Sequence, residues 1–110
     1  MEKVYIMSGA LHDFIMDQRR EAEEFSKKPG CFMGMMPHPS ETKYWSERVP
    51  TGTLEEYKRI ELEESAYYMA ADAMSKSYAR SLDFSAMSNE QLDHFCDQMA
   101  ILIKADMEAA

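Results

Sequence analysis

The chain has 110 residues, 45% of them hydrophobic and 29% charged, which is the balance of a folded globular protein and excludes an intrinsically disordered one. This length predicts one helical domain over residues 1–110 with a single modest core. No apolar run approaches the length of a membrane span, so we expect no membrane contact.

The formal net charge of −8 is concentrated in the second half of the chain. Residues 51–110 carry 5 Lys/Arg and 12 Asp/Glu, a net charge of −7. A surface of this kind repels a phosphate backbone, so direct binding to duplex nucleic acid is not expected. It favours basic protein partners instead, including proteins that themselves handle nucleic acid.

The two cysteines, Cys31 and Cys96, lie far apart and follow no disulfide framework. No secretory leader is evident in the first residues of this sequence, so we expect a reduced, cytoplasmic protein. A disulfide between the two cysteines is the alternative in an oxidising compartment.

Apolar residues at helical spacing predict a first helix over residues 2–27. At about 100° per residue, Val4, Leu11 and Ile15 lie on one face and charged residues on the other. The segment SKKPG ends the helix, because cations suit a helix C-terminus and Pro-Gly stops it. A short strand over KVYIM is the competing interpretation of the beginning.

Residues 29–52 form a long connection that holds all four prolines and three of the four glycines. Connections of this length are usually functional or disordered, and the aromatic residues in this one favour an ordered loop. Its segment PSETKYWSER is expected to contain a short helix.

The second helix is predicted over residues 53–81, beginning at a Thr53–Glu56 capping box. It carries two apolar stripes, so we expect it to be the central helix, covered on two sides. Ala66 is small enough to let a neighbouring helix approach closely. Glu64 interrupts a stripe, either at the margin of the core or as a receiver for a cationic side chain of a partner.

The third helix is predicted over residues 88–108, with Ser88 and Gln91 in a second capping box. Leu92 and Met99 belong to its expected buried face, and its outer face is acidic. The three helices together predict an all-α, three-helix bundle-like fold.

The connection contains a set of side chains that suits Cu(I). These are Cys31, Met33, Met35, Met36 and His38. Methionine is frequent throughout the chain, with 11 in all, and also serves as adaptable apolar filler. We therefore predict no metal site and no cofactor, and keep copper as the least favoured hypothesis. No catalytic motif is present, so we expect a protein that is not an enzyme.

We expect a small acidic protein that works by binding another, basic protein, as adaptor or inhibitor, and that also forms homodimers or higher oligomers. An origin in a phage or mobile element suits such a role. Aromatic, methionine and arginine side chains typify interface centres, and acidic helical faces can occupy basic sites. The predicted protein-binding residues are Phe32, Met35, Met36, Tyr44, Trp45, Arg48, Glu90, Asp93, Asp97 and Ile101.

The rival hypothesis is an oligomer that binds a small ligand such as a nucleotide through the connection. In that case Tyr44 and Trp45 stack on the base, while Lys43 and Arg48 hold the phosphates.

Overall fold

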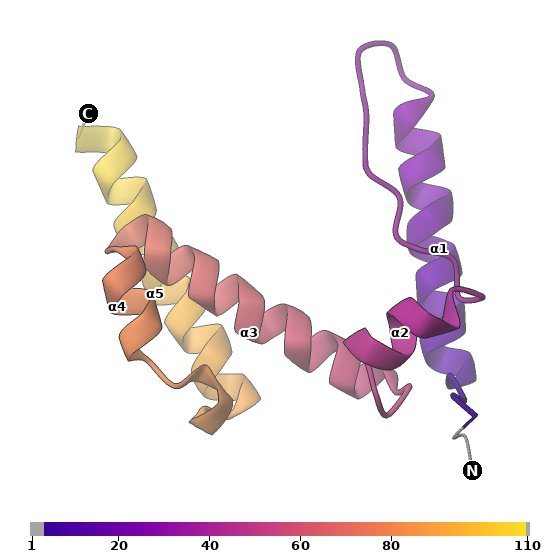
Figure 1. Ribbon diagram of the computed structural model, residues 1–110. Coiled ribbons are helices and arrows are strands. Elements are labelled where there is room, and N and C mark those ends of the chain that lie inside the picture. Colours follow the sequence, from indigo (N-terminus) through magenta and orange to yellow (C-terminus); the bar gives the residue numbers. More distant parts are fainter. Residues whose placement is uncertain (1–3, 110) are drawn as a thin grey trace. The chain divides into compact units, whose positions relative to one another are not determined.

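The computed structural model describes residues 4–109, and within this range the chain forms helices and no strand (Figure 1). The predicted all-α fold class is confirmed. The elements are α1 (Gly9–Ser26), α2 (Thr42–Arg48), α3 (Leu54–Ala73), α4 (Lys76–Ser81), the 3-10 turn η1 (Phe84–Ala86) and α5 (Asn89–Ala109).

The chain divides into two compact units, unit 1 over residues 1–57 and unit 2 over residues 58–110. Each unit has its own hydrophobic core. The single domain over residues 1–110 stays a prediction.

In unit 1, α1 begins later than the sequence predicted. The predicted helix over residues 2–27 is wrong for residues 4–8, which are not helical, and residues 2 and 3 lie outside the described range. The Ser8 hydroxyl accepts a hydrogen bond from the Leu11 amide (3.1 Å) and caps α1. The Ser8 amide itself donates to the Gly52 carbonyl (2.9 Å), which holds this segment outside the helix.

The core of unit 1 joins α1, α2 and the first turn of α3. Its buried side chains are Leu11, Ile15, Trp45, Val49 and Tyr57. The short helix predicted within PSETKYWSER is present as α2.

The chain after α1 runs back beside that helix (Figure 1). Ser26 Oγ accepts from the Met33 amide (3.1 Å), and the Arg19 guanidinium donates to the Met36 carbonyl (2.5 Å). The connection is therefore ordered along α1, as its aromatic content predicted.

In unit 2, the helix predicted over residues 53–81 is interrupted. α3 ends at Ala73, and Ser75 adopts an extended conformation whose hydroxyl accepts from the Tyr78 amide (3.0 Å) to cap α4. Serine competes well for such a position because its side chain satisfies an amide that the helix terminus leaves unpaired.

The core of unit 2 forms where the small residues of α3 meet α4, η1 and α5. Ala66 and Ala70 are fully buried, which confirms the close approach predicted at Ala66. The predicted helix over residues 88–108 is confirmed as α5, with Leu92 and Met99 buried. Its capping box is complete, because the Gln91 amide donates to Ser88 Oγ (3.1 Å) and the Ser88 amide to Gln91 Oε1 (2.8 Å).

Candidate protein-binding surface

The connection in unit 1 exposes part of the predicted contact set. Phe32 is 84% exposed, and Met35 and Tyr44 are also exposed, whereas Met36 and Arg48 are half-buried. These side chains lie along the loop and on α2. Lys43 is exposed on α2.

Trp45 is not a surface residue. It is 1% exposed in the core of unit 1, where its ring lies 6.1 Å from that of Tyr57. Its indole N–H donates to the carbonyls of Pro37 (3.3 Å) and His38 (3.1 Å), which satisfies the one polar group of the buried ring. The prediction that Trp45 contacts a protein or stacks on a nucleobase is wrong for this structure, because neither ring face is accessible.

The side chains considered for copper are held in different ways. Cys31 is half-buried, while Met33 and Met35 are exposed. His38 Nδ1 accepts from the Ser40 amide (3.0 Å) and lies 2.9 Å from Ser40 Oγ, so this nitrogen already has protein partners. Among residues 4–109, no three His, Cys, Asp or Glu side chains gather as metal ligands would.

The acidic stripe of α5 consists of Glu90, Asp93, Asp97 and Ile101, and all four side chains are exposed. Their spacing of three or four residues places them along one line of the helix, opposite Leu92. Ile101 is 60% exposed in line with the three carboxylates. The structure thus brings together the residues that the sequence predicted on this helix.

The pKa of the Cys96 thiol is raised by its surroundings on α5. Burial raises the pKa of its thiol, and the carboxylates of Asp93 and Asp97 raise the pKa further. Both effects disfavour the thiolate, which is the reactive form of a cysteine.

A second feature of unit 2 is an acidic, aromatic groove of about 390 Å³. It is lined by Glu63, Glu64, Tyr67, Tyr68, Asp83, Phe84 and Ser85. No lysine or arginine is among these lining residues. Carboxylates beside tyrosine rings suit a cationic side chain, through both charge and the ring faces.

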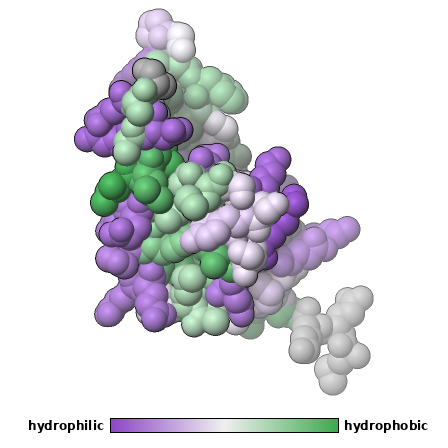
Figure 2. All heavy atoms as spheres, turned by 90° about the vertical axis from the view of Figure 1, so that its left-hand side faces the viewer, coloured by the Kyte–Doolittle hydropathy of each residue, from purple (hydrophilic) through white to green (hydrophobic). Residues whose placement is uncertain are grey.

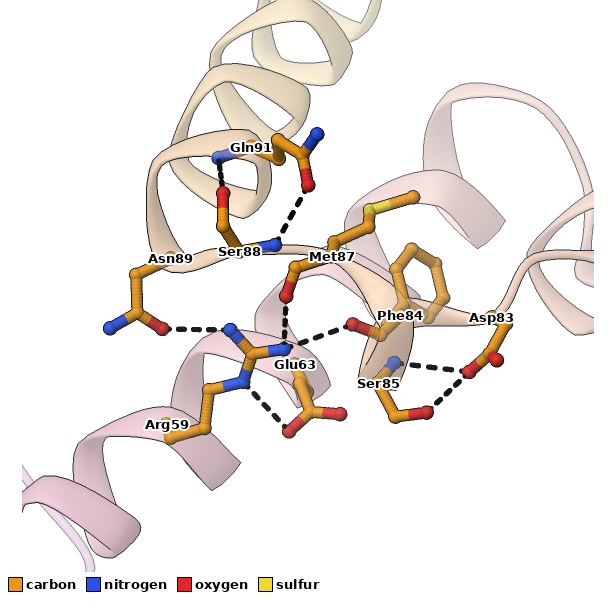
Figure 3. A network of polar contacts seen from close by, with 9 residues as sticks. All are labelled: Arg59, Glu63, Asp83, Phe84, Ser85, Met87, Ser88, Asn89 and Gln91. Atoms are coloured by element: carbon orange, nitrogen blue, oxygen red, sulfur yellow. Dashed lines mark hydrogen bonds and ion pairs between the residues drawn. The ribbon is translucent and has the colours of Figure 1, made fainter.

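One side of the groove is held in place by Arg59 of α3 (Figure 3). Its guanidinium donates to the carbonyls of Phe84 (3.1 Å) and Met87 (2.5 Å), to Asn89 Oδ1 (2.7 Å) and to Glu63 Oε2 (3.1 Å). Figure 3 also shows Asp83 accepting from the Ser85 amide and hydroxyl. Arg59 therefore ties η1 and the beginning of α5 to α3.

Most of this groove has no signal in the sequence. A cationic partner is predicted there only for Glu64, and no element is predicted over residues 82–87. Arg59 and Glu63 are four residues apart on a predicted helix, and this spacing indicates an ion pair. The bonds from Arg59 to the Phe84 and Met87 carbonyls depend on the tertiary fold and had no sequence signal.

Comparison with known proteins gives no relative: no protein-family model, no curated protein and no solved structure matches this chain. In residues 4–109, every helix is too short or too polar to cross a membrane.

Proposed function

We propose that this chain acts by binding a basic protein, as adaptor or inhibitor, through the acidic surface of unit 2. The observation that carries the proposal is the stripe on α5, where three exposed carboxylates lie in line with the exposed Ile101. Carboxylates steer a basic partner into contact, and an apolar side chain among them gives the contact an anchor that loses water on binding.

The groove supports the same class of partner. An arginine or lysine side chain fits a depression lined by Glu64 and Asp83 beside Tyr67 and Tyr68, in which Glu63 is already paired with Arg59. This proposal gives Glu64 the second of the roles considered for it, as part of a receiver for a cation.

The cell compartment is part of the proposal. Cys31 and Cys96 follow no disulfide framework in the sequence, which supports a reducing compartment such as the cytoplasm. The chain is proposed to be a binding protein and not an enzyme.

The test is capture of partners by the tagged protein in its own host, with quantitative mass spectrometry of what is bound. Replacing Asp93 and Asp97 together by lysine should remove a basic polypeptide that the wild type retains. We expect at least about a tenfold loss, and also a loss at high salt, because the attraction is electrostatic.

The matched control reverses Asp13 and Asp17 of α1, which are also exposed and four residues apart. This variant has the same net charge, so it should retain the partner. Equal losses in both variants would mean that only net charge matters, and would contradict a specific site on α5.

The small-ligand alternative is tested on the same samples by native mass spectrometry without chelator. A retained nucleotide or metal mass would contradict the proposal. Trp45→Ala cannot discriminate between the hypotheses, because it removes a core side chain of unit 1. Lys43→Ala is the suitable variant, since Lys43 is exposed on α2.

A further inference from the structure

The last part of α5 has little cover from the rest of unit 2. Of residues 100–109, only Ile103 is partly buried, and all the others are exposed. Met107 is 73% exposed. Helices gain most of their stability from packing of an apolar face, so exposed apolar residues here indicate a missing neighbour.

These side chains form an apolar groove with α3. The groove has a volume of about 530 Å³ and is lined by Met69, Ala100, Ile103, Lys104, Met107 and Glu108. Figure 2, which faces the side of α4 and α5, shows hydrophobic atoms reaching the surface between hydrophilic ones. The five α5 residues follow the spacing of a helix-packing seam, at 100, 103, 104, 107 and 108.

The charges of the groove indicate which partner covers it. Its described lining contains one cation, Lys104, and one anion, Glu108, whose charged atoms lie 4.0 Å apart one turn along the helix. Such a pair has no net charge, so it does not select the basic partner of the acidic stripe. A second copy turned through 180° presents the same two residues in the opposite order along its helix. The lysine of each copy then faces the glutamate of the other, so the two surfaces are complementary in charge.

We propose that this groove is the interface with a second copy of the chain, in which two α5 helices pair antiparallel about a two-fold axis close to residues 105–106. Ile103 of each copy then packs near Met107 of the other. Lys104 of each copy comes near Glu108 of the other, which fixes the antiparallel orientation. Met69 of α3 adds apolar surface beside the pair.

The first test measures the oligomeric state of the purified full chain by sedimentation over a wide range of concentration. The wild type should be a dimer, and Met107→Glu should raise the dissociation constant at least about tenfold, because it places a charge in a dry contact. Met74→Glu is the matched control, since Met74 is an exposed methionine of unit 2 outside the groove. A monomeric wild type, or a dimer that Met107→Glu leaves unchanged, would overturn the proposal.

The second test exploits the symmetry. Lys104→Glu and Glu108→Lys each place like charges across the proposed interface, so each variant alone should be mainly monomeric. A mixture of the two should form heterodimers, because Lys104 of one then meets Glu108 of the other and the reversed residues also attract. Circular dichroism of each variant checks that α5 remains helical.

The mixing result separates an intermolecular pair from the ion pair within each helix, which mixing cannot restore. Failure of the mixture to dimerise would overturn the antiparallel arrangement. The proposed binding of a basic protein is not affected by that result, because it rests on the stripe of α5 and not on this groove.

Discussion

Gly52 has a backbone conformation and a neighbour that together exclude a side chain. Its φ of +70° lies in the left-handed region. A Cβ at this position would overlap the Ile6 carbonyl oxygen and lie 3.2 Å from Met7 Cα. Because these neighbours are backbone atoms, they cannot rotate away. Gly52→Ala should lower the free energy of unfolding by about 2–4 kcal/mol, as measured by chemical denaturation.

Alanine substitutions at two other glycines distinguish the cost of backbone strain from the cost of steric overlap. Gly30 has φ +74° with no atom near an added Cβ, so Gly30→Ala should cost only about 1 kcal/mol. Gly34 has neither a left-handed φ nor a close neighbour, so Gly34→Ala should leave stability within about 0.5 kcal/mol of the wild type. If the Gly30→Ala and Gly52→Ala variants lost the same free energy of unfolding, the overlap of the added Cβ with the Ile6 carbonyl would contribute nothing to the loss.

The Cys96 thiol provides a pH-dependent measure of the charge on α5. Burial is the main cause of its raised pKa, with contributions from Asp93 and Asp97. Because the thiolate is the reactive form, replacing both aspartates by asparagine should lower the pKa and speed alkylation of Cys96 at mildly alkaline pH. The rates are measured with iodoacetamide in a Cys31→Ser background.

The sign of the effect on stability follows from the same shift. The folded state holds the Cys96 proton more tightly than the unfolded chain, so the contribution of the thiol to stability is complete at neutral pH. The free energy of unfolding should fall as the pH rises through the pKa of the unfolded thiol towards that of the folded one.

Glu90→Gln is the control for the alkylation experiment. If this variant accelerated the alkylation of Cys96 equally, the assignment of the pKa shift to Asp93 and Asp97 would be contradicted.

At the scale of elements, Arg59 is the side chain that fixes η1 and α5 against α3. It donates to two carbonyls and one amide oxygen of residues 84–89, and also to Glu63. Truncation removes these bonds and leaves the partly buried Met87 carbonyl without this donor, whereas the Phe84 carbonyl keeps the bond from the Met87 amide. Arg59→Ala should therefore lower the free energy of unfolding by about 2–3 kcal/mol. Arg59→Lys should recover only part of this loss, because an ammonium cannot reproduce the planar fork.

The control for Arg59 is an exposed arginine with a single ion pair. Arg20 contacts Asp17 at 2.8 Å, and both side chains are more than half exposed. Arg20→Ala should change stability by less than about 1 kcal/mol. If the two alanine variants were equally stable in urea denaturation, the contacts of Arg59 would carry no net energy.

The elements differ in how far their sequence predicts them. α5 has a capping box and a regular apolar face, and both signals are local, so its bounds came out within a residue. The break after Ala73 was missed because the apolar spacing continues through Tyr78, while a single serine cap outweighs it. The burial of Trp45 was missed because local sequence does not reveal which side of a short helix meets α1 and Tyr57.

The candidate surface divides in the same way. The stripe of α5 was predicted because it depends only on helical spacing, and the structure leaves its four side chains exposed. The groove joins α3 to residues 83–85, which are held together by Arg59 and by the packing of Phe84, Leu82 and Met87. Contacts between distant segments of this kind have no periodic signal in a single sequence.

At the scale of the whole molecule, the two cores raise the question of how cooperatively the chain unfolds. Among the described residues, the core of unit 1 and the core of unit 2 share no buried side chain. Ile15 belongs to the first and Leu92 to the second, and both are fully buried. Truncating either to alanine should cost about 2–5 kcal/mol in its own unit.

Hydrogen exchange of backbone amides shows which helices are destabilised by each substitution. Leu92→Ala should speed exchange in α4 and α5 and leave α1 near its wild-type rate, whereas Ile15→Ala should do the reverse. α3 is the informative element, because its first turn packs in unit 1 and the rest in unit 2. We expect the amides of residues 62–73 to exchange faster in the Leu92→Ala variant and at the wild-type rate in the Ile15→Ala variant. If either substitution sped exchange equally everywhere, residues 1–110 would unfold as one domain, as their length predicts.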